Sequence, residues 1–540
     1  MTTTPAANKR YRKEEKHAFK DCVKQVAILL FLALRIVIDW FIDFVFGFFY
    51  KNDDTKKLPG VKENFLLKSA SSLAQLIREK QISSEKVVVA YIERIKEVNP
   101  SLNAVVDDRY DEAIKEAKDV DKFLAETDLT TEEIKKTKPF LGVPFTSKES
   151  TSAKGLAFTF GLVSRKSYIA SADAAVVERL KDSGAILIAV TNIPELNLWC
   201  ETRNNIYGQT QNPYDLTKTV GGSSGGEAAI ISACGSPLGI GTDIGGSTRM
   251  PAYFCGVFGH KPTTGLITTK GLTFRKGNEG ETMVSAGTIT RFAEDITPFL
   301  KLLLDDNLSL PKLDQKVNLQ DVKVAYCLNP QDLRVSPVSN EVIAAILKAV
   351  DHLSTISKYH VDKISLDGFR YSLSLWRHEM SKEPGNFAFD LSNQKGDISL
   401  KSELPKLIFG KCEFTIPALM RLIDLNVLPP TNKSWAEDKK KQLVQEIQEL
   451  LGDNGVLLFP SCPTEAPYHY ASFLRPYNFA YWAIFNVLKL PVTQVPLGLT
   501  KKGLPIGLQV VSNHYNDHLC IAIAEELQRV FGGWTPPFTD

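Results

Sequence analysis

The sequence predicts an α/β protein with a single large domain. Stretches of helical periodicity alternate with short apolar, strand-like stretches from about residue 61 to the end of the chain. No internal repeat, low-complexity run or long linker interrupts this part. The composition, with 44% hydrophobic and 23% charged residues, is that of an average globular protein. Although 540 residues could hold several domains of about 150 residues each, one large domain is the simplest interpretation.

The clearest elements follow from periodicity and capping residues. Residues 84–98 (SEKVVVAYIERIKEV) have the pattern of a helix that ends at Asn99-Pro100. The other expected elements are, in order, a helix over 174–183, the strand AILIAVT, a helix over 435–451, the strand VLLFP, the strand-like PVTQVPL and IGLQVV, and a helix from Asp517 to Gly532.

Charge and cysteine spacing exclude several function classes. Lys and Arg number 64 against 62 Asp and Glu, and the net charge of +2 is too small for a nucleic-acid-binding protein. The eight cysteines are spread singly, which fits neither a zinc site nor a small disulfide framework and favours reduced thiols in a reducing compartment. With no HExxH motif either, the sequence asks for no metal and no cofactor.

The N-terminus departs from the average composition. Residues 1–25 are basic, and residues 26–50 are apolar, with seven aromatic residues in the last eleven positions. A polar linker over 51–60 leads into the main domain, 61–540. Because the apolar stretch is long enough to span a bilayer and its basic flank would bind an anionic surface, we expect residues 26–50 to be a membrane anchor.

Three charged residues, Arg35, Asp39 and Asp43, interrupt this anchor. On a helix their spacing forms one stripe, in which Arg35 can pair with a carboxylate. Their insertion cost roughly cancels the gain from the apolar side chains. A spanning helix with a paired stripe, a hairpin, a helix lying in the interface and a buried helix of the main domain therefore all stay open.

The densest functional signal lies between Gly221 and Pro251, where nine of 31 residues are glycine and the glycines bracket serines twice. Glycine is needed where the backbone approaches a ligand or adopts a positive φ. A serine beside such a backbone can act as a nucleophile while loop amides bind an oxyanion. A structural glycine-rich crossing with incidental serines is the plainer alternative.

Two other motifs compete for this segment. A phosphate-binding loop would need GxxxxGK[ST], which is absent, and the nearby Lys261 fits no such register. The run from Gly221 to Gly225 satisfies GxSxG, with His514 or His518 as base, but the residues before it read as a turn and not as the required strand.

A third interpretation adds Lys148, in the segment FLGVPFTSKES. A lone lysine after a short strand is usually a solvated loop residue. A serine hydroxyl, however, needs a base to take its proton, and a neutral lysine can serve if burial lowers its pKa from about 10.4.

With these motifs the sequence resembles the amidase signature family of serine hydrolases. The matching segments are GVPFTSKES, VGGSSGGEAA and GTDIGGSTRMPA, with 75 residues from the lysine to the first serine and 24 between the serines. The resemblance extends from about residue 61 to the C-terminus. It implies the α/β amidase-signature domain, with a central mixed β-sheet flanked by helices.

The resemblance also implies roles for individual residues. Ser247 would be the acylated nucleophile, Ser223 a bridging serine that follows a cis peptide after Gly222, and Lys148 the terminal base and acid. The expected oxyanion hole is the set of backbone amides of Ile244, Gly245, Gly246 and Ser247. The residues expected to hold the surrounding loops are Ser224, Asp243 and Arg249.

Two features favour the fatty-acid amide hydrolase branch. They are the N-terminal apolar segment and FTIPALMRLIDLNVL at 414–428, which lies where that branch has a membrane-facing lid and which otherwise reads as a core helix. Within the branch the sequence is most similar to the second type, in the short N-terminal anchor, in NNIYGQTQNPYDL at 204–216 and in the final NDHL…FGGW at 516–534. The resemblance then implies hydrolysis of oleamide-like primary amides and anandamide-like N-acylethanolamines to a fatty acid and an amine. Residues Asn197, Leu198 and Trp199 would line the acyl pocket.

The alternatives are an amidase or glutamine amidotransferase-type subunit acting on a small polar amide, and a non-catalytic lipid-binding protein with the same fold. The expected partners are a lipid amide and a membrane, with no nucleic acid. The expected location is an endomembrane or lipid droplet, with the catalytic domain in a reducing compartment. The sequence leaves a homodimer open.

Overall fold

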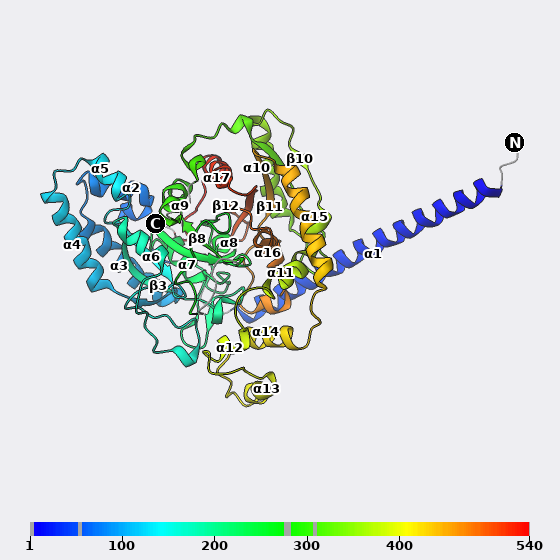
Figure 1. The fold of residues 1–540 in the computed structure, drawn as a ribbon, viewed down its shortest axis with the longest axis horizontal. Helices are drawn as coiled ribbons and strands as arrows, with labels where there is room; N and C mark the ends of the chain where they lie inside the picture. Colours follow the sequence, from blue (N-terminus) through cyan, green and yellow to red (C-terminus); the bar gives the residue numbers. More distant parts are fainter. Residues whose placement is uncertain (1–4, 52–56, 275–281, 306–309, 539–540) are drawn as a thin grey trace.

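The computed structural model describes residues 5–51, 57–274, 282–305 and 310–538 (Figure 1). Its centre is an eleven-stranded sheet with the order β1-β3-β2-β6-β8-β7-β12-β13-β11-β9-β10. Strands β3, β2 and β6 are mutually parallel, as are β11, β9 and β10, and the other neighbouring pairs are antiparallel. The sheet is therefore mixed, which confirms the expected α/β class.

The strands of this sheet are short and mostly buried. Their bounds are β1 Val105–Asp108, β2 Pro144–Lys148, β3 Ile186–Thr191, β6 Leu238–Asp243, β7 Phe258–Lys261, β8 Ser285–Thr290, β9 Lys323–Tyr326, β10 Asp362–Lys363, β11 Gly455–Pro460, β12 Val492–Leu499 and β13 Pro505–Ser512. A separate small hairpin consists of β4 Arg203–Asn204 and β5 Gly208–Gln209.

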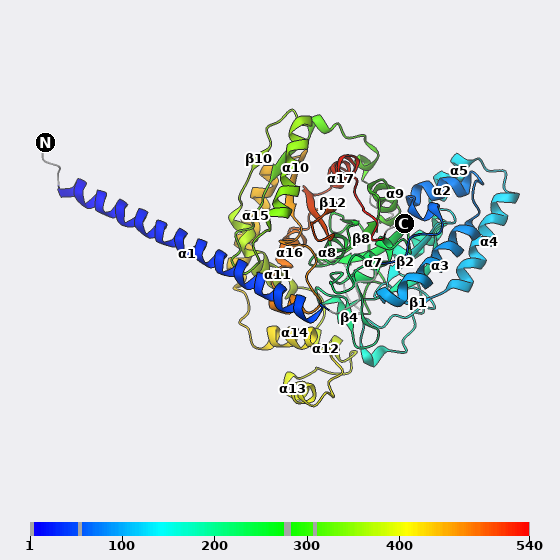
Figure 2. The same ribbon diagram turned by 180° about the vertical axis from the view of Figure 1, so that it is seen from behind.

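Helices flank the sheet (Figures 1 and 2). Helices α6, α9, α10 and α17 pack on its strands, and α7 and α8 pack against β6 and β7. The bounds are α1 Pro5–Phe49, α2 Ala70–Arg78, α3 Ser84–Leu102, α4 Tyr110–Glu126, α5 Thr131–Thr137, α6 Ala175–Asp182, α7 Gly225–Ser232, α8 Arg249–Phe254, α9 Ile296–Leu303, α10 Asn340–Ile356, α11 Ser372–Met380, α12 Phe387–Leu391, α13 Leu400–Ile408, α14 Ile416–Asn426, α15 Lys433–Leu451, α16 Ala480–Val487 and α17 Asp517–Phe531.

Helices α6, α15 and α17 confirm the expected helices closely, but the expected end of α3 is wrong. The helix continues through Pro100 to Leu102 and is capped by Asn103, whose backbone is left-handed at φ 49° and ψ 47°. The Asn99 side chain explains the extension, since its Oδ1 accepts from the N–H groups of Ala104 and Val105 at 2.8 Å and fixes the turn that follows. These bonds compensate for the one that proline cannot donate.

Helix α1 runs without a break across the expected boundary between a basic segment and an anchor, and its N-terminal part extends away from the rest of the protein (Figures 1 and 2). In the part of the chain that the structure describes, no helix is both long and apolar enough to cross a membrane. Most of the expected linker, 52–56, lies outside the described residues.

The charged stripe of α1 contacts the main domain. Asp39 pairs with Arg35 on the same helix, at 3.4 Å. The buried Arg475 donates from Nε to Asp39 Oδ1 at 3.0 Å and from Nη1 to Asp43 Oδ1 at 2.8 Å. Arg35 also donates to Ser336 Oγ at 3.4 Å. The three charges that interrupt the apolar segment therefore face the protein.

Candidate active site

Strand β2 places Lys148 at its C-terminal end, fully buried below the serine loops. Its Nζ donates to Ser223 Oγ at 2.6 Å and to Thr242 Oγ1, on β6, at 2.8 Å. The sequence motifs bring Lys148 and Ser223 together as expected. Thr242 was not foreseen, because a threonine inside a strand carries no signal of its own.

Burial lowers the pKa of Lys148 to about 7, although the charges of Asp243, Glu227 and Glu149 act in the opposite direction. At neutral pH and above, this amine is therefore available as a base. Burial also raises the pKa of Glu227 to about 8, so that this neighbour is largely protonated at pH 7. Its Oε2 takes a hydrogen bond from Thr146, two residues before the lysine, at 2.7 Å.

The segment before Ser223 requires glycine. Gly221 has a φ of +79°, and a Cβ added to Gly222 would lie 2.2 Å from the carbonyl oxygen of Trp199. The peptide bond between Gly222 and Ser223 is cis, as expected. Ser224 then joins the two serine loops, because its N–H donates to the Ser247 carbonyl at 3.1 Å and its Oγ accepts from the Thr242 N–H at 3.3 Å.

Ser247 lies on the loop after β6, which Asp243 and Arg249 hold from below. The Arg249 guanidinium donates to both Asp243 oxygens at 3.0 Å, and neither side chain is exposed. Burial would raise the pKa of Asp243, but the charge and hydrogen bonds of Arg249 outweigh it and hold that pKa well below its usual range. Arg249 also donates to Asn486 and Gln509, which complete a buried network that the motifs did not reveal.

Of the four amides expected to form the oxyanion hole, the one of Gly246 already has an acceptor within its own loop. The N–H of Gly246 donates to Asp243 Oδ1 at 2.7 Å, so this amide is committed to its own loop. Gly246 has a left-handed φ of +114° in this turn. Among the described residues no acceptor takes the N–H of Ile244, Gly245 or Ser247. These three residues line the same cavity.

That cavity has a volume of about 580 Å³, and Ser247, Asn197, Leu198 and Trp199 all lie on its wall. Asn197 exchanges hydrogen bonds with Ser150, the second residue after the buried lysine. Most of the wall was not foreseen, because it comes from segments distant in sequence. These contributors include Trp376 on α11, Met420 and Ile423 on α14, and Tyr477 and Phe479 before α16.

Comparison with known proteins identifies the family. The Amidase family model matches residues 86–521. The chain belongs to the amidase signature family. Fatty-acid amide hydrolase 2 of Homo sapiens is 42% identical over 486 residues, which cover 88% of this chain and 91% of the human protein. Fatty-acid amide hydrolase 2-A of Danio rerio is 38% identical, over 93% of this chain and 96% of its own.

Solved structures show the same fold. A crystal structure of an amidase superposes with a TM-score of 0.71 at 23% identity, and the match covers 86% of this chain and 100% of the amidase. A fatty acid amide hydrolase structure superposes with a TM-score of 0.68 at 22% identity, over 88% of this chain and 86% of its own. The family match and the relatives named fatty-acid amide hydrolase 2 show that this amidase is a hydrolase of the carbon–nitrogen bond of amides.

The competing sequence interpretations do not fit the amidase geometry. His514 lies on a second cavity of about 350 Å³, lined by other residues, and Ser223 contacts Lys148 and not a histidine. Lys261 is buried and donates to the carbonyl of Pro262 at 2.7 Å, so it is not part of a phosphate-binding loop.

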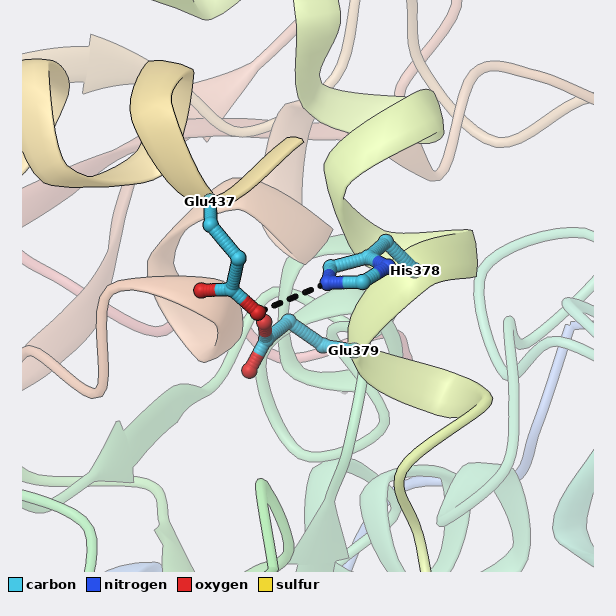
Figure 3. Close-up of side chains that lie close together, drawn as sticks. All are labelled: His378, Glu379 and Glu437. Atoms are coloured by element: carbon cyan, nitrogen blue, oxygen red, sulfur yellow. Dashed lines mark hydrogen bonds and ion pairs between the residues drawn. The ribbon is translucent and has the colours of Figure 1, made fainter. Parts of the chain in front are cut away.

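One cluster of the amidase has the composition of a metal site. His378, Glu379 and Glu437 bring ligand atoms together between α11 and α15 (Figure 3). His378 Nε2 and Glu437 Oε1 lie 2.9 Å apart. Both carboxylates already pair with lysine, since Lys382 contacts Glu379 at 2.6 Å and Glu437 at 2.5 Å, and Lys440 contacts Glu379 at 2.8 Å. This cluster connects two helices by ion pairs.

Proposed function

We propose that this amidase cleaves fatty-acid amides, such as oleamide and anandamide, to a fatty acid and an amine through an acyl-enzyme on Ser247. The observation that carries the proposal is the pairing of Lys148 and Ser223, at 2.6 Å, beside a largely apolar cavity that has Ser247 on its wall. Relatives named fatty-acid amide hydrolase 2 support the substrate class.

The first step is acylation of Ser247. As Ser247 Oγ attacks the amide carbon, Ser223 Oγ takes its proton and passes its own proton to neutral Lys148 Nζ. When the carbon–nitrogen bond breaks, the proton returns through Ser223 to the departing nitrogen. The same relay then activates water, which adds to the acyl carbon, releases the fatty acid and restores Ser247. Burial of Lys148 supports this role because it favours the neutral amine.

The negative charge that develops on the substrate oxygen needs donors in place. The amides of Ile244, Gly245 and Ser247 have no acceptor among the described residues, and these residues line the cavity, so we assign them this role. Asp243 and Arg249 hold the loop from below without contacting the substrate.

The cavity suits an acyl chain, because its wall is largely apolar, with Met420 and Ile423 supplied by α14 and Leu428 by the residues after this helix. Arg421 and Asp424 of α14 pair with each other on the wall. A small polar amide such as glutamine would leave most of this surface without contacts.

We further propose that the amidase binds a membrane through the outer face of α1. With the charged stripe turned to Arg475, the opposite face exposes apolar side chains, namely Leu29, Leu30, Leu34, Val37, Trp40, Phe41, Phe44, Phe48 and Phe49. Further exposed apolar residues lie on α13 and α14 and beside them, namely Ile408, Phe409, Ile416, Leu425, Val427 and Leu428, the last of which also lines the cavity. Exposed apolar side chains of this kind fit an endomembrane or lipid-droplet surface.

Turnover of oleamide and of glutamine by the purified full-length protein in detergent micelles tests the proposal. We expect hydrolysis of oleamide with no release of ammonia from glutamine, and a loss of roughly 10⁴-fold or more in kcat for Ser247→Ala. Glutamine turnover without oleamide turnover would favour an amidotransferase-type subunit, and no turnover of either amide would favour a lipid-binding protein.

A further inference from the structure

Trp376 contacts the loop that carries the nucleophile although it lies far from it in sequence. It stands on α11, lines the acyl cavity, and donates from Nε1 to the carbonyl oxygen of Ile244 at 2.8 Å. It is also close to the next residue, since a Cβ on Gly245 would lie 3.1 Å from Nε1. This tryptophan belongs to no motif, and none of the roles assigned above involves it.

The bond to Ile244 fixes the orientation of one peptide unit. In a trans peptide the C=O and the following N–H point in opposite directions in one plane. A carbonyl of Ile244 held toward the indole therefore turns the N–H of Gly245 away from the indole. In the described part of the chain no acceptor takes that N–H. The indole thus controls the direction of a free donor beside Ser247.

The other peptides of the loop are held by different groups. Asp243 takes the N–H of Gly246 at 2.7 Å, and Asn486 Nδ2 donates to the Asp243 carbonyl at 3.1 Å. On the opposite side, Trp482 packs so closely that a Cβ on Gly246 would lie 2.5 Å from its own Cβ. Neither Asp243 nor Asn486 bonds the Ile244–Gly245 peptide. Among the described residues, the side chain that bonds it is the indole of Trp376.

Helix α11 is itself fixed at both ends. Near its start, Ser372 Oγ donates to the carbonyl of Ala480 on α16 at 2.7 Å. Near its end, His378 pairs with Glu437 of α15 (Figure 3), and Lys440 of α15 donates to Glu379. The Trp376 ring meets Phe479 edge to face, with centroids 5.0 Å apart. The donor therefore stands on a rigid support, as a preorganised site requires.

We propose that Trp376 is a positioning residue for the oxyanion hole, and that it orients the Gly245 N–H toward the substrate oxygen. Because the bond is made to the loop and not to the substrate, its loss raises the energy of the charged transition state and leaves substrate binding nearly unchanged. The inference rests on the proposed acyl transfer at Ser247. Removal of a complete oxyanion donor costs about 10²- to 10³-fold in kcat, so a misoriented donor should cost about 10- to 100-fold.

The test compares Trp376→Phe with Trp199→Phe, which makes the same change at another tryptophan of the same cavity. With oleamide, we expect Trp376→Phe to lower kcat about 10- to 100-fold and to change KM by less than about threefold. Trp199→Phe should act mainly on KM. A third variant replaces Trp376 with benzothienylalanine, which has the same shape but no N–H, and it should match Trp376→Phe.

A second measurement separates positioning from general structural damage. A long-chain trifluoromethyl ketone forms a hemiketal on the nucleophile and places an oxyanion in the hole. We expect its inhibition constant to rise in Trp376→Phe by the same factor by which kcat/KM falls, with the melting temperature nearly unchanged. An active wild type whose kcat survives both Trp376 replacements would overturn the inference, whereas an inactive wild type would instead overturn the proposed function.

Discussion

The floor of the active site, formed by Lys148, Asp243 and Arg249, and the outer face of α1 depart from the usual distribution of polarity in opposite ways. At the floor, these three residues are charged or ionisable and fully buried. On α1, large apolar side chains such as Trp40 and Phe49 are more than half exposed. Folded proteins normally bury apolar residues and expose charged ones.

The difference lies in where the partners are. Each buried group at the floor has partners in the chain: Lys148 has two hydroxyl acceptors, and Asp243 has Arg249. The exposed apolar face of α1 has none among the described residues, while its charged face is paired with Arg475. The buried charged groups are therefore satisfied by partners within the protein. The exposed apolar face of α1 instead favours contact with a partner of low polarity outside it.

The largest effect on this comparison should come from Lys148→Met. Without the base, we expect kcat for oleamide to fall by roughly 10²- to 10⁴-fold. Lys261→Met is the matched control, because burial also lowers the pKa of Lys261 to about 7 but its Nζ contacts Pro262 and Thr264 and neither serine. Equal losses in both variants would show that any buried lysine matters to the fold and would remove the special role of Lys148.

The next effect concerns stability. Arg249→Met leaves the buried carboxylate of Asp243 without its partner, and the removal of one member of a buried pair costs about 3 to 5 kcal/mol. We expect a lower midpoint of urea unfolding. The double variant Arg249→Met with Asp243→Asn should recover part of this loss, since no buried charge remains. A double variant less stable than Arg249→Met alone would contradict this reading of the network.

On α1, the triple variant Trp40→Ser, Phe41→Ser and Phe44→Ser should weaken binding to anionic lipid vesicles at least tenfold. Each large side chain contributes about 1.5 to 3 kcal/mol when fully buried and less in an interface. Turnover of a short, soluble amide should stay the same. The control changes Leu129, Tyr168 and Ile169 to serine, since these residues are exposed elsewhere on the protein. Vesicle flotation that is unaffected by the α1 changes would locate the membrane contact elsewhere.

The smallest expected effect is a shift of the pH profile. Since neutral Lys148 is the active form and its pKa is about 7, kcat/KM should rise through about pH 7 and level off above it. Thr242→Val removes an acceptor that stabilises the ammonium form, so the pKa should fall and the rising limb should move to lower pH. Activity that increases toward acidic pH would exclude the lysine as base.

Thr288→Val is the control for that shift, because Thr288 is also buried, on the neighbouring strand, and its hydroxyl has no hydrogen-bond partner among the described residues. We expect its profile to match that of the wild type. The kcat of Thr242→Val should fall about three- to tenfold, in keeping with the loss of one bond that fixes the Lys148 amine.

The alternation of helical and strand-like stretches was enough to predict the α/β class. The resemblance to the amidase signature motifs predicted the pairing of Lys148 with Ser223 and the location of Asn197, Leu198 and Trp199 on the cavity wall. Thr242 and Trp376 could not be predicted, because the three-dimensional fold alone brings an ordinary strand residue and a helix residue to the site.

The role of Arg35, Asp39 and Asp43 could not be predicted from the sequence either. There these charges only make the segment less apolar. No sequence pattern indicates that Asp43 and Asp39 pair with Arg475, which lies 432 and 436 residues away from them. Similarly, the commitment of the Gly246 amide to Asp243 depends on a local turn that the motif allows but does not specify.

The central claim is that the buried relay activates Ser247 for acyl transfer. Labelling the full-length protein with a long-chain fluorophosphonate, followed by peptide mapping by mass spectrometry, tests this claim most directly. We predict one adduct, on Ser247, with labelling that is slowed strongly in Lys148→Met and is unaffected in Lys261→Met. An adduct on Ser223 or on a residue outside the cavity, or equal labelling of Lys148→Met and wild type, would contradict the account.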